Sequence, residues 1–191
     1  MTASTSSRAR EVRLLILDVD GVLTDGGLQF DNRGEEFKTF NSLDGHGIRM
    51  LMNGGIEVAV ITGRQSKIVE HRMTDLGVSH LYQGSRDKMT AFTTLLQTVG
   101  VTAEQAAYVG DDLPDLPVLR RVGLAIAVQN AHPFVREHCH WVTDRRGGHG
   151  AGLEGGDGPN SRSRLFDGRN VRRSAGNRRL GSAGLRRLSV A

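Results

Sequence analysis

The sequence contains a single cysteine and no long apolar run. Cys139 alone cannot form an internal disulfide bond, and such sparing use of cysteine is typical of a reducing compartment. The first apolar stretch, residues 12–17, is interrupted by Arg13 and is far shorter than the roughly 20 residues of a membrane-spanning helix. We therefore expect a cytoplasmic protein with no membrane span, and we interpret the cysteine as a small core residue.

Positive charge is scarce over most of the chain, although the sequence pI is about 9.8. Residues 151–191 hold nine arginines and three acids, which leaves 16 basic and 18 acidic side chains in residues 1–150. The main part of the chain is therefore not basic, and we do not expect it to bind nucleic acid. An arginine-rich nucleic-acid-binding arm is the alternative for the last 41 residues, but Phe166 is the only aromatic side chain there for base stacking.

Short apolar segments alternate with segments of helical periodicity along the chain. This alternation predicts an α/β fold, doubly wound and Rossmann-like, with a mostly parallel sheet and helices on both faces. Two short segments at 28–30 and 36–40 predict a β-hairpin directly after the first strand. The first predicted strand begins at Leu14 and breaks at Gly21. The other predicted strands are 56–61, 79–82, 106–109 and 123–128, and the predicted helices are 44–53, 66–76, 87–99 and 135–139.

Composition divides the chain into three parts. Residues 1–10 are rich in Ser, Thr and Arg, and we expect them to form a disordered leader. Residues 11–151 are of one-domain size. Gly, Arg and Ser dominate residues 152–191, where no apolar periodicity survives, so we expect a disordered or aberrant tail.

Two carboxylates, Asp18 and Asp20, stand at the carboxyl end of the first predicted strand, which breaks at Gly21. Side chains two apart on a strand share a face, and ligands of open α/β sheets bind at the carboxyl ends of the strands. Two like charges held this close need a cation, a shared proton or a reacting group. The alternatives are a solvated turn and a calcium loop, but the glycine comes too early for a calcium loop and Gln29 replaces the required glutamate.

Polar residues also occur where other predicted strands end or helices begin. They are Thr62, Gly63, Arg64, Lys88, Asp111, Asp112 and Asp115. Taken singly, the threonine and glycine could form a plain turn and the lysine could be solvated. Because the carboxyl ends of parallel strands meet at one edge, we expect these groups to converge on a site for a hard divalent cation and a phosphoryl group.

These motifs resemble the four signature motifs of the haloacid dehalogenase superfamily of phosphatases. The first motif resembles residues 18–22, the second Thr62-Gly63, the third Lys88 and the fourth residues 110–115. Within the superfamily the chain resembles the small, capless 3-deoxy-D-manno-octulosonate 8-phosphate phosphatase group. The hairpin after the first motif and the segments 44–48, 62–64 and 147–151 carry this second resemblance, which extends over roughly residues 12–151.

The resemblance implies a role for each acid of the motifs. Asp18 would be the nucleophile that forms an aspartyl-phosphate, and Asp20 would give a proton to the leaving oxygen and later take one from water. Mg²⁺ would be held by Asp18, the Asp20 backbone carbonyl and Asp111, supported by Asp112 and Asp115.

The resemblance also implies how the substrate is held. Thr62 and Lys88 would bind the transferring phosphoryl group, while Arg64, Gly63 and His46 would contact the substrate together with Asp20. The substrate would be a small sugar-acid phosphate, with nine-carbon keto-acid phosphates as close competitors. A domain that binds a phosphorylated ligand without turnover is the alternative from a different class.

Relatives of this group form homotetramers in which the hairpin of one subunit covers the neighbour's site. We therefore expect a homotetramer, with residues 28–40 as the lid. The chain departs from the group after Ala151, where the Gly/Arg-rich tail replaces the C-terminal helix of relatives, and a shifted reading frame is our hypothesis for this change. His138, Cys139 and His140 are adjacent, which does not favour one shared metal ion.

Overall fold

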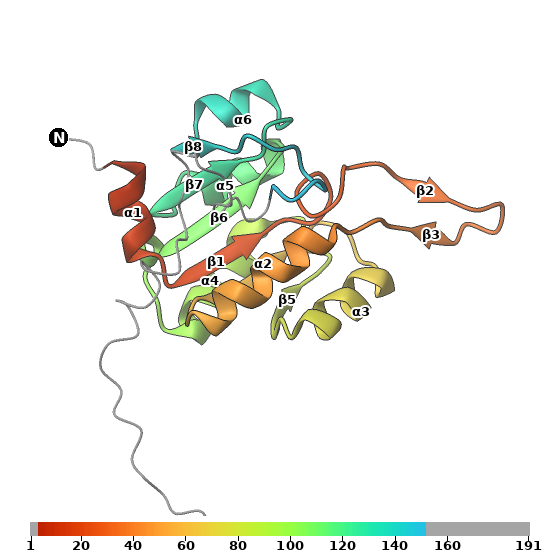
Figure 1. Ribbon diagram of the computed structural model, residues 1–191, viewed down its shortest axis with the longest axis horizontal. Coiled ribbons are helices and arrows are strands. Elements are labelled where there is room, and N and C mark those ends of the chain that lie inside the picture. Colours follow the sequence, from red (N-terminus) through yellow and green to blue (C-terminus); the bar gives the residue numbers. More distant parts are fainter. Residues whose placement is uncertain (1–3, 152–191) are drawn as a thin grey trace, which may run out of the picture.

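A six-stranded sheet forms the centre of the computed structural model, which describes residues 4–151 (Figure 1). The strand order is β5-β4-β1-β6-β7-β8, and every neighbouring pair is parallel. The strands of this sheet are β1 (Leu14–Leu17), β4 (Glu57–Ile61), β5 (His80–Tyr82), β6 (Ala106–Gly110), β7 (Leu124–Ala127) and β8 (Trp141–Val142). The helices are α1 (Thr5–Glu11), α2 (Ser42–Asn53), α3 (Lys67–Leu76), α4 (Lys88–Val99), α5 (Leu116–Leu119) and α6 (Pro133–Glu137), with 3₁₀ turns η1 (Ala103–Gln105) and η2 (Leu113–Asp115).

Helices cover both faces of the sheet, as predicted for a doubly wound α/β fold. Helices α2 and α3 pack on one face, whereas α4 and α5 pack on the other (Figure 1). All four residues of β1 are buried, because the strand is central and covered on both sides. Full burial of each leucine or isoleucine stabilises the fold by roughly 1.5–3 kcal/mol, which explains why this apolar run forms the central strand.

The direction of winding reverses beside β1. The chain passes from β1 through α2 to β4 on one side, and later returns through α4 to β6 on the other side. Leu17 is in register with Val60 of β4 and with Val109 of β6, so the three strands end side by side. In open α/β sheets the crevice at such a reversal is where ligands bind, so the topology places a site at the carboxyl end of β1.

The predicted hairpin forms directly after β1. Its strands, β2 (Gln29–Phe30) and β3 (Glu36–Phe37), pair antiparallel and project beyond the edge of the main sheet (Figure 1). The Asp31 amide donates to the Glu35 carbonyl, and Gly34 adopts a φ of +81° in the turn. Glycine adopts this left-handed conformation without the steric cost that other residues bear, which is why the reversal occurs here.

The expectation of a disordered leader over residues 1–10 is wrong for the part that the structure describes. Residues Thr5–Glu11 form α1, capped by Ser4, whose hydroxyl accepts a hydrogen bond from the Ser7 amide. Arg8 Nη1 donates to the Gly123 carbonyl at 2.8 Å, and Ala9 is buried. These contacts with a distant segment stabilise a helix that is too short to form alone. The composition of residues 1–10 shows no apolar periodicity, so it does not predict such a helix.

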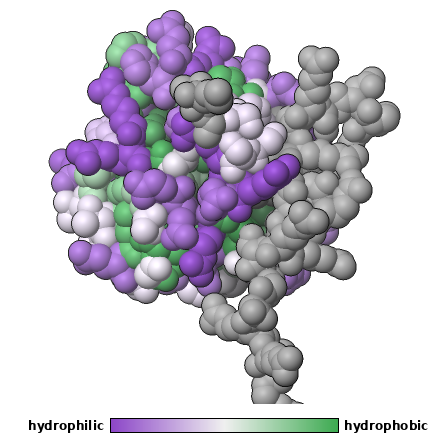
Figure 2. All heavy atoms as spheres, turned by 90° about the vertical axis from the view of Figure 1, so that its left-hand side faces the viewer, coloured by the Kyte–Doolittle hydropathy of each residue, from purple (hydrophilic) through white to green (hydrophobic). Residues whose placement is uncertain are grey.

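The surface beside α1 is largely polar. Figure 2 shows that hydrophilic side chains cover much of this face, with apolar ones in smaller areas between them. Within residues 4–151, no helix has the length and apolar character needed to cross a membrane. The predicted tail, residues 152–191, lies outside the described part of the chain.

Candidate active site

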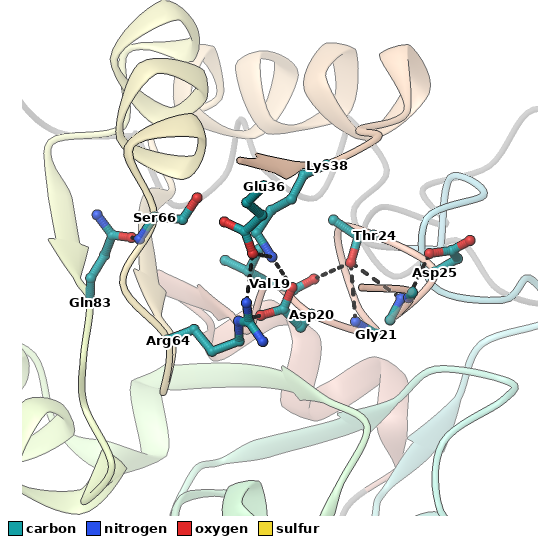
Figure 3. A network of polar contacts seen from close by, with 12 residues as sticks. Val19, Asp20, Gly21, Thr24, Asp25, Glu36, Lys38, Arg64, Ser66 and Gln83 are labelled. Atoms are coloured by element: carbon teal, nitrogen blue, oxygen red, sulfur yellow. Dashed lines mark hydrogen bonds and ion pairs between the residues drawn. The ribbon is translucent and has the colours of Figure 1, made fainter. Parts of the chain in front are cut away.

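Hydrogen bonds within its own backbone hold the turn after β1. The amides of Val22, Leu23 and Thr24 all donate to the carbonyl of Val19, and the Thr24 hydroxyl accepts from the Gly21 amide at 3.4 Å (Figure 3). Gly21 adopts a φ of +89°, and a Cβ atom there would overlap with the carboxylate of Asp111. A glycine is therefore required at this position for both its conformation and the close approach of the fourth motif.

The predicted glycine-rich segment at 147–151 packs against this turn. The Gly148 amide donates to the Val22 carbonyl at 2.9 Å, and a Cβ atom on Gly147 would overlap with the Gly21 carbonyl oxygen. The Gly150 amide donates to Asp44 Oδ2 at 3.2 Å, which connects the segment to the first turn of α2. The segment therefore holds the first motif in place from the far end of the domain.

Lys88 joins two acids that lie far apart in the sequence, Asp18 after β1 and Asp115 in η2. This first residue of α4 is buried, and its Nζ lies 2.9 Å from Asp18 Oδ2 and 2.7 Å from Asp115 Oδ1. Asp87 caps the helix by accepting a hydrogen bond from the Met89 amide, which places the lysine at the edge of the site. The predicted convergence of the first, third and fourth motifs is thus present in the structure.

Four donors surround the carboxylate of Asp115. Its Oδ1 accepts from Lys88 and from the Tyr108 hydroxyl at 2.7 Å, and its Oδ2 accepts from the amides of Asp111 at 3.0 Å and Asp112 at 3.2 Å. A carboxylate with this many partners is held rigidly. Asp115 therefore organises the backbone of the fourth motif.

Burial and mutual repulsion change the proton affinities of the acids. Burial and the charge of Asp115 raise the pKa of Asp18 to about 6, although Lys88 opposes the rise. Burial, followed by the charges of Asp115 and Asp18, raises the pKa of Asp111 to about 7. Burial lowers the pKa of Lys88, but the charges of Asp18 and Asp115 outweigh it and raise that pKa above its usual value. Three carboxylates face one lysine here, so the site carries excess negative charge that a cation would offset.

The acids also offer ligands to a hard cation. Carboxylate oxygens of Asp18, Asp111 and Asp115 lie within 4.8 Å of one another, the only such group of His, Cys, Asp or Glu side chains in residues 4–151. Asp18 Oδ1 is buried and has no hydrogen-bond partner, whereas both oxygens of Asp115 already accept hydrogen bonds. Carboxylate oxygens are suitable ligands for Mg²⁺. Because the oxygens of Asp115 are already engaged, Asp18 and Asp111 are the better ligands for the ion.

A cavity of about 370 Å³ lies over this cluster. Thr62, which directly follows β4 and is buried, lines it together with Gly63 and Arg64. The residues that line it include all the predicted site residues except His46: Asp18, Asp20, Thr62, Gly63, Arg64, Lys88, Asp111, Asp112 and Asp115, with Gly26 and Pro114. His46 instead lies on the exposed side of α2.

Two side chains that the sequence did not single out, Lys38 and Glu36, contact predicted site residues. Lys38 pairs with Asp20 Oδ1, and Arg64 Nη2 donates to Glu36 Oε1 at 2.7 Å (Figure 3). Partial burial raises the pKa of Glu36, but hydrogen bonds and the charge of Lys38 outweigh it and hold that pKa below its usual value. The alternation Glu36-Phe37-Lys38 was the available signal, because it places both charged side chains on one face of the hairpin.

The adjacent histidines have local structural partners. His140 Nδ1 accepts from the Ala125 amide at 2.9 Å, and His138 Nδ1 lies 2.7 Å from the Phe134 carbonyl oxygen. Burial raises the pKa of the Cys139 thiol to about 12, which makes it a poor nucleophile.

Residues 78–151 match the family described as haloacid dehalogenase-like hydrolase. The 3-deoxy-D-manno-octulosonate 8-phosphate phosphatase of Escherichia coli is 50% identical over 151 residues, which are 79% of this chain and 80% of that protein. The crystal structure of the Yersinia pestis enzyme of this name has a TM-score of 0.77 at 51% identity, covering 78% of this chain and 80% of that one. The Moraxella catarrhalis enzyme of this name, in complex with magnesium ion, phosphate ion and KDO, has a TM-score of 0.75 at 40% identity, covering 77% and 84%.

Proposed function

The chain belongs to the family of 3-deoxy-D-manno-octulosonate 8-phosphate phosphatases, and we propose that it hydrolyses this phosphomonoester through an aspartyl-phosphate on Asp18. The observation that carries the proposal is the unpartnered, buried Oδ1 of Asp18 beside Lys88 and Asp111. A carboxylate so placed is available to both a cation and a phosphorus atom. The product sugar acid is a precursor of lipopolysaccharide.

In this mechanism an oxygen of Asp18 forms a bond with phosphorus while the bond from phosphorus to the sugar oxygen breaks. Asp20 gives its proton to the departing oxygen, then takes one from the water that hydrolyses the aspartyl-phosphate. Lys88, held between Asp18 and Asp115, and the Thr62 hydroxyl stabilise the charge on the phosphoryl oxygens.

Asp18 and Asp111, with the Asp20 backbone carbonyl, would hold Mg²⁺, and the Moraxella catarrhalis complex supports this cofactor. When bound, Mg²⁺ offsets the repulsion between the anionic nucleophile and the anionic phosphate. Asp112 supports this arrangement by capping η2, because its side chain accepts from the Leu113 amide at 2.8 Å.

The test is Mg²⁺-dependent release of phosphate from the eight-carbon keto-acid phosphate, a nine-carbon keto-acid phosphate and 4-nitrophenyl phosphate. We expect the eight-carbon substrate to have the highest kcat/KM, and Asp18→Asn to abolish turnover of all three. Asp75→Asn on the exposed side of α3 is the matched control and should keep full activity. Wild-type turnover no higher than that of Asp18→Asn would instead favour a domain that binds phosphorylated ligands without hydrolysis.

We also propose that the chain forms a homotetramer in which the hairpin of one subunit covers a neighbour's site. Leu28, Phe30 and Phe37 on the hairpin are 54%, 55% and 54% exposed, which is unusual for side chains of this size. Sedimentation at micromolar concentration should show the tetramer in the wild type and a smaller species in a Phe30→Ser/Phe37→Ser variant. A wild-type monomer would contradict the shared site. A cytoplasmic location stays a prediction.

A further inference from the structure

Lys38 is a buried lysine whose positive charge faces carboxylates. Its side chain is 2% exposed, and its Nζ pairs with Asp20 Oδ1 and lies 3.3 Å from Glu36 Oε1. Lysine side chains are seldom buried unless their charge is balanced, because removal from water is costly. Two carboxylates balance it here, and one of them is Asp20, the second acid of the first motif.

The two oxygens of Asp20 face different cations. Oδ1 pairs with Lys38, whereas Oδ2 lies 3.6 Å from Arg64 Nε (Figure 3). Arg64 in turn donates to Glu36, so that two acids and two bases form one closed cluster. Its charges cancel, which allows it to persist beside the more acidic cluster around Asp18.

Lys38 and Arg64 differ in how far their side chains are buried, and this difference limits what each can contact. Arg64 is 40% exposed at its side chain and lines the cavity, so it can exchange its contact with Asp20 for one with a ligand. Lys38 is enclosed and does not line the cavity, so it can act on a ligand only through Asp20. With Oδ1 held by Lys38, Oδ2 is the oxygen left for proton exchange.

We propose that Lys38 positions the Asp20 carboxylate for proton transfer to the leaving group, an inference that rests on the proton-carrying role of Asp20 in the proposed function. The residue directly follows β3, and Glu36 lies within that strand. The hairpin therefore contributes to the chemistry of its own subunit, and a displacement of the hairpin moves the group that orients Asp20.

The test compares leaving groups of different basicity. An alkoxide leaving group, as in the eight-carbon keto-acid phosphate, needs a proton when the bond to phosphorus breaks, whereas 4-nitrophenolate needs little assistance. We expect Lys38→Met to lower kcat/KM about 100-fold for the sugar phosphate and less than about tenfold for 4-nitrophenyl phosphate, since general acid catalysis contributes roughly 10²–10⁴-fold. Asp20→Asn should show the same asymmetry, and Lys38→Arg should recover most of the lost sugar phosphate activity.

Lys67→Met is the matched control, because Lys67 is exposed at the start of α3 and the chain has three lysines in all. It should leave both kcat/KM values unchanged. If Lys38→Met does not fold, E36Q/K38M removes one charge of each sign and supplies the same comparison.

Three outcomes are distinguishable. Equal losses for both substrates in Lys38→Met, or no loss, would overturn the positioning role while Asp20→Asn still shows the asymmetry. Unchanged rates in Asp20→Asn would overturn both the proposed function of that acid and this inference. Asymmetric loss in both variants supports the inference, because a merely structural defect would not depend on the leaving group.

Discussion

The hydroxyl of Tyr108 donates a hydrogen bond of 2.7 Å to Asp115 Oδ1, the same oxygen that accepts from Lys88. Tyr108 lies within β6 and is fully buried. Its hydroxyl thus connects the centre of the sheet to Lys88, which contacts Asp18. An oxygen with two donors helps to fix the position of each of them, so the position of Lys88 depends on a strand residue that does not line the cavity.

Tyr108→Phe removes that hydroxyl without changing the volume of the ring. We expect a loss of about 1.5–3 kcal/mol in the free energy of unfolding, the usual contribution of a hydrogen bond to a charged group. We also expect kcat to fall roughly tenfold, because Asp115 then fixes Lys88 less firmly; about 1.4 kcal/mol corresponds to such a change. Tyr82→Phe is the matched control, since Tyr82 is the other tyrosine and its hydroxyl has no hydrogen bond within residues 4–151. Equal effects of the two substitutions would contradict the prediction.

Gly21→Ala tests the close approach of the first and fourth motifs. Gly21 has a φ of +89°, and a Cβ atom added there would overlap with the Asp111 carboxylate. We therefore expect the substitution both to destabilise the fold and to reduce Mg²⁺-dependent activity. Gly55→Ala is matched in conformation, with a φ of +87°, but its Cβ would meet nothing within 4 Å. Both variants should lose about 1–2 kcal/mol of stability from the left-handed conformation. Titration with Mg²⁺ should show weakened binding in the first variant alone; unchanged affinity there would refute the argument.

The metal-free protein should become less stable as pH rises from 5 to 8. The pKa values of Asp18 and Asp111 are raised from 3.8 to about 6 and about 7, so the folded state binds more protons than the unfolded state between these values. Their contribution to stability is complete below pH 3.8 and is lost as pH rises through 6 and 7. Saturating Mg²⁺ should reverse the trend, since it favours the ionised acids and is displaced by protons at low pH.

Thermal unfolding with and without Mg²⁺ across this pH range measures the effect. Burial lowers the pKa of His140, which acts in the opposite direction near pH 6. The variant Asp18→Asn/Asp111→Asn retains that histidine, so the difference from wild type isolates the two acids. The stability difference between metal-free wild type and variant should be more favourable to the wild type at pH 5 than at pH 8. The opposite order would contradict the predicted pH dependence.

Arg64→Ala should separate substrate binding from chemistry. The partly exposed guanidinium lines the cavity, and its contact with Glu36 keeps it near Asp20. We expect KM for the sugar-acid phosphate to rise at least tenfold, equivalent to about 1.4 kcal/mol, while KM for 4-nitrophenyl phosphate changes little, because the small ester lacks the sugar that Arg64 would contact. Arg72→Ala on α3 is a control outside the cavity. An equal rise for both substrates would exclude a role for Arg64 in recognising the sugar.

The sequence determined those features that depend on near neighbours along the chain. The apolar run that begins at Leu14 predicted the first strand, and the spacing of Asp18 and Asp20 at its end predicted a site, because strand periodicity and parallel pairing are local rules. The same rules brought Thr62, Lys88 and Asp111 to one edge, and residues that line the cavity there match the prediction.

Only the tertiary structure decided which side chains contact the predicted site residues. Lys38 reaches Asp20 because the chain returns from the hairpin to the carboxyl end of β1, where Glu36 also contacts Lys38. Tyr108 looks in the sequence like one more apolar strand position, and only the structure shows that its hydroxyl contacts Asp115. The helix at residues 5–11 is likewise stabilised by contacts with Gly123, more than a hundred residues away in the chain. Such partners depend on burial and long-range packing, which fix the position and charge balance of a side chain but leave no periodic pattern in the sequence around it.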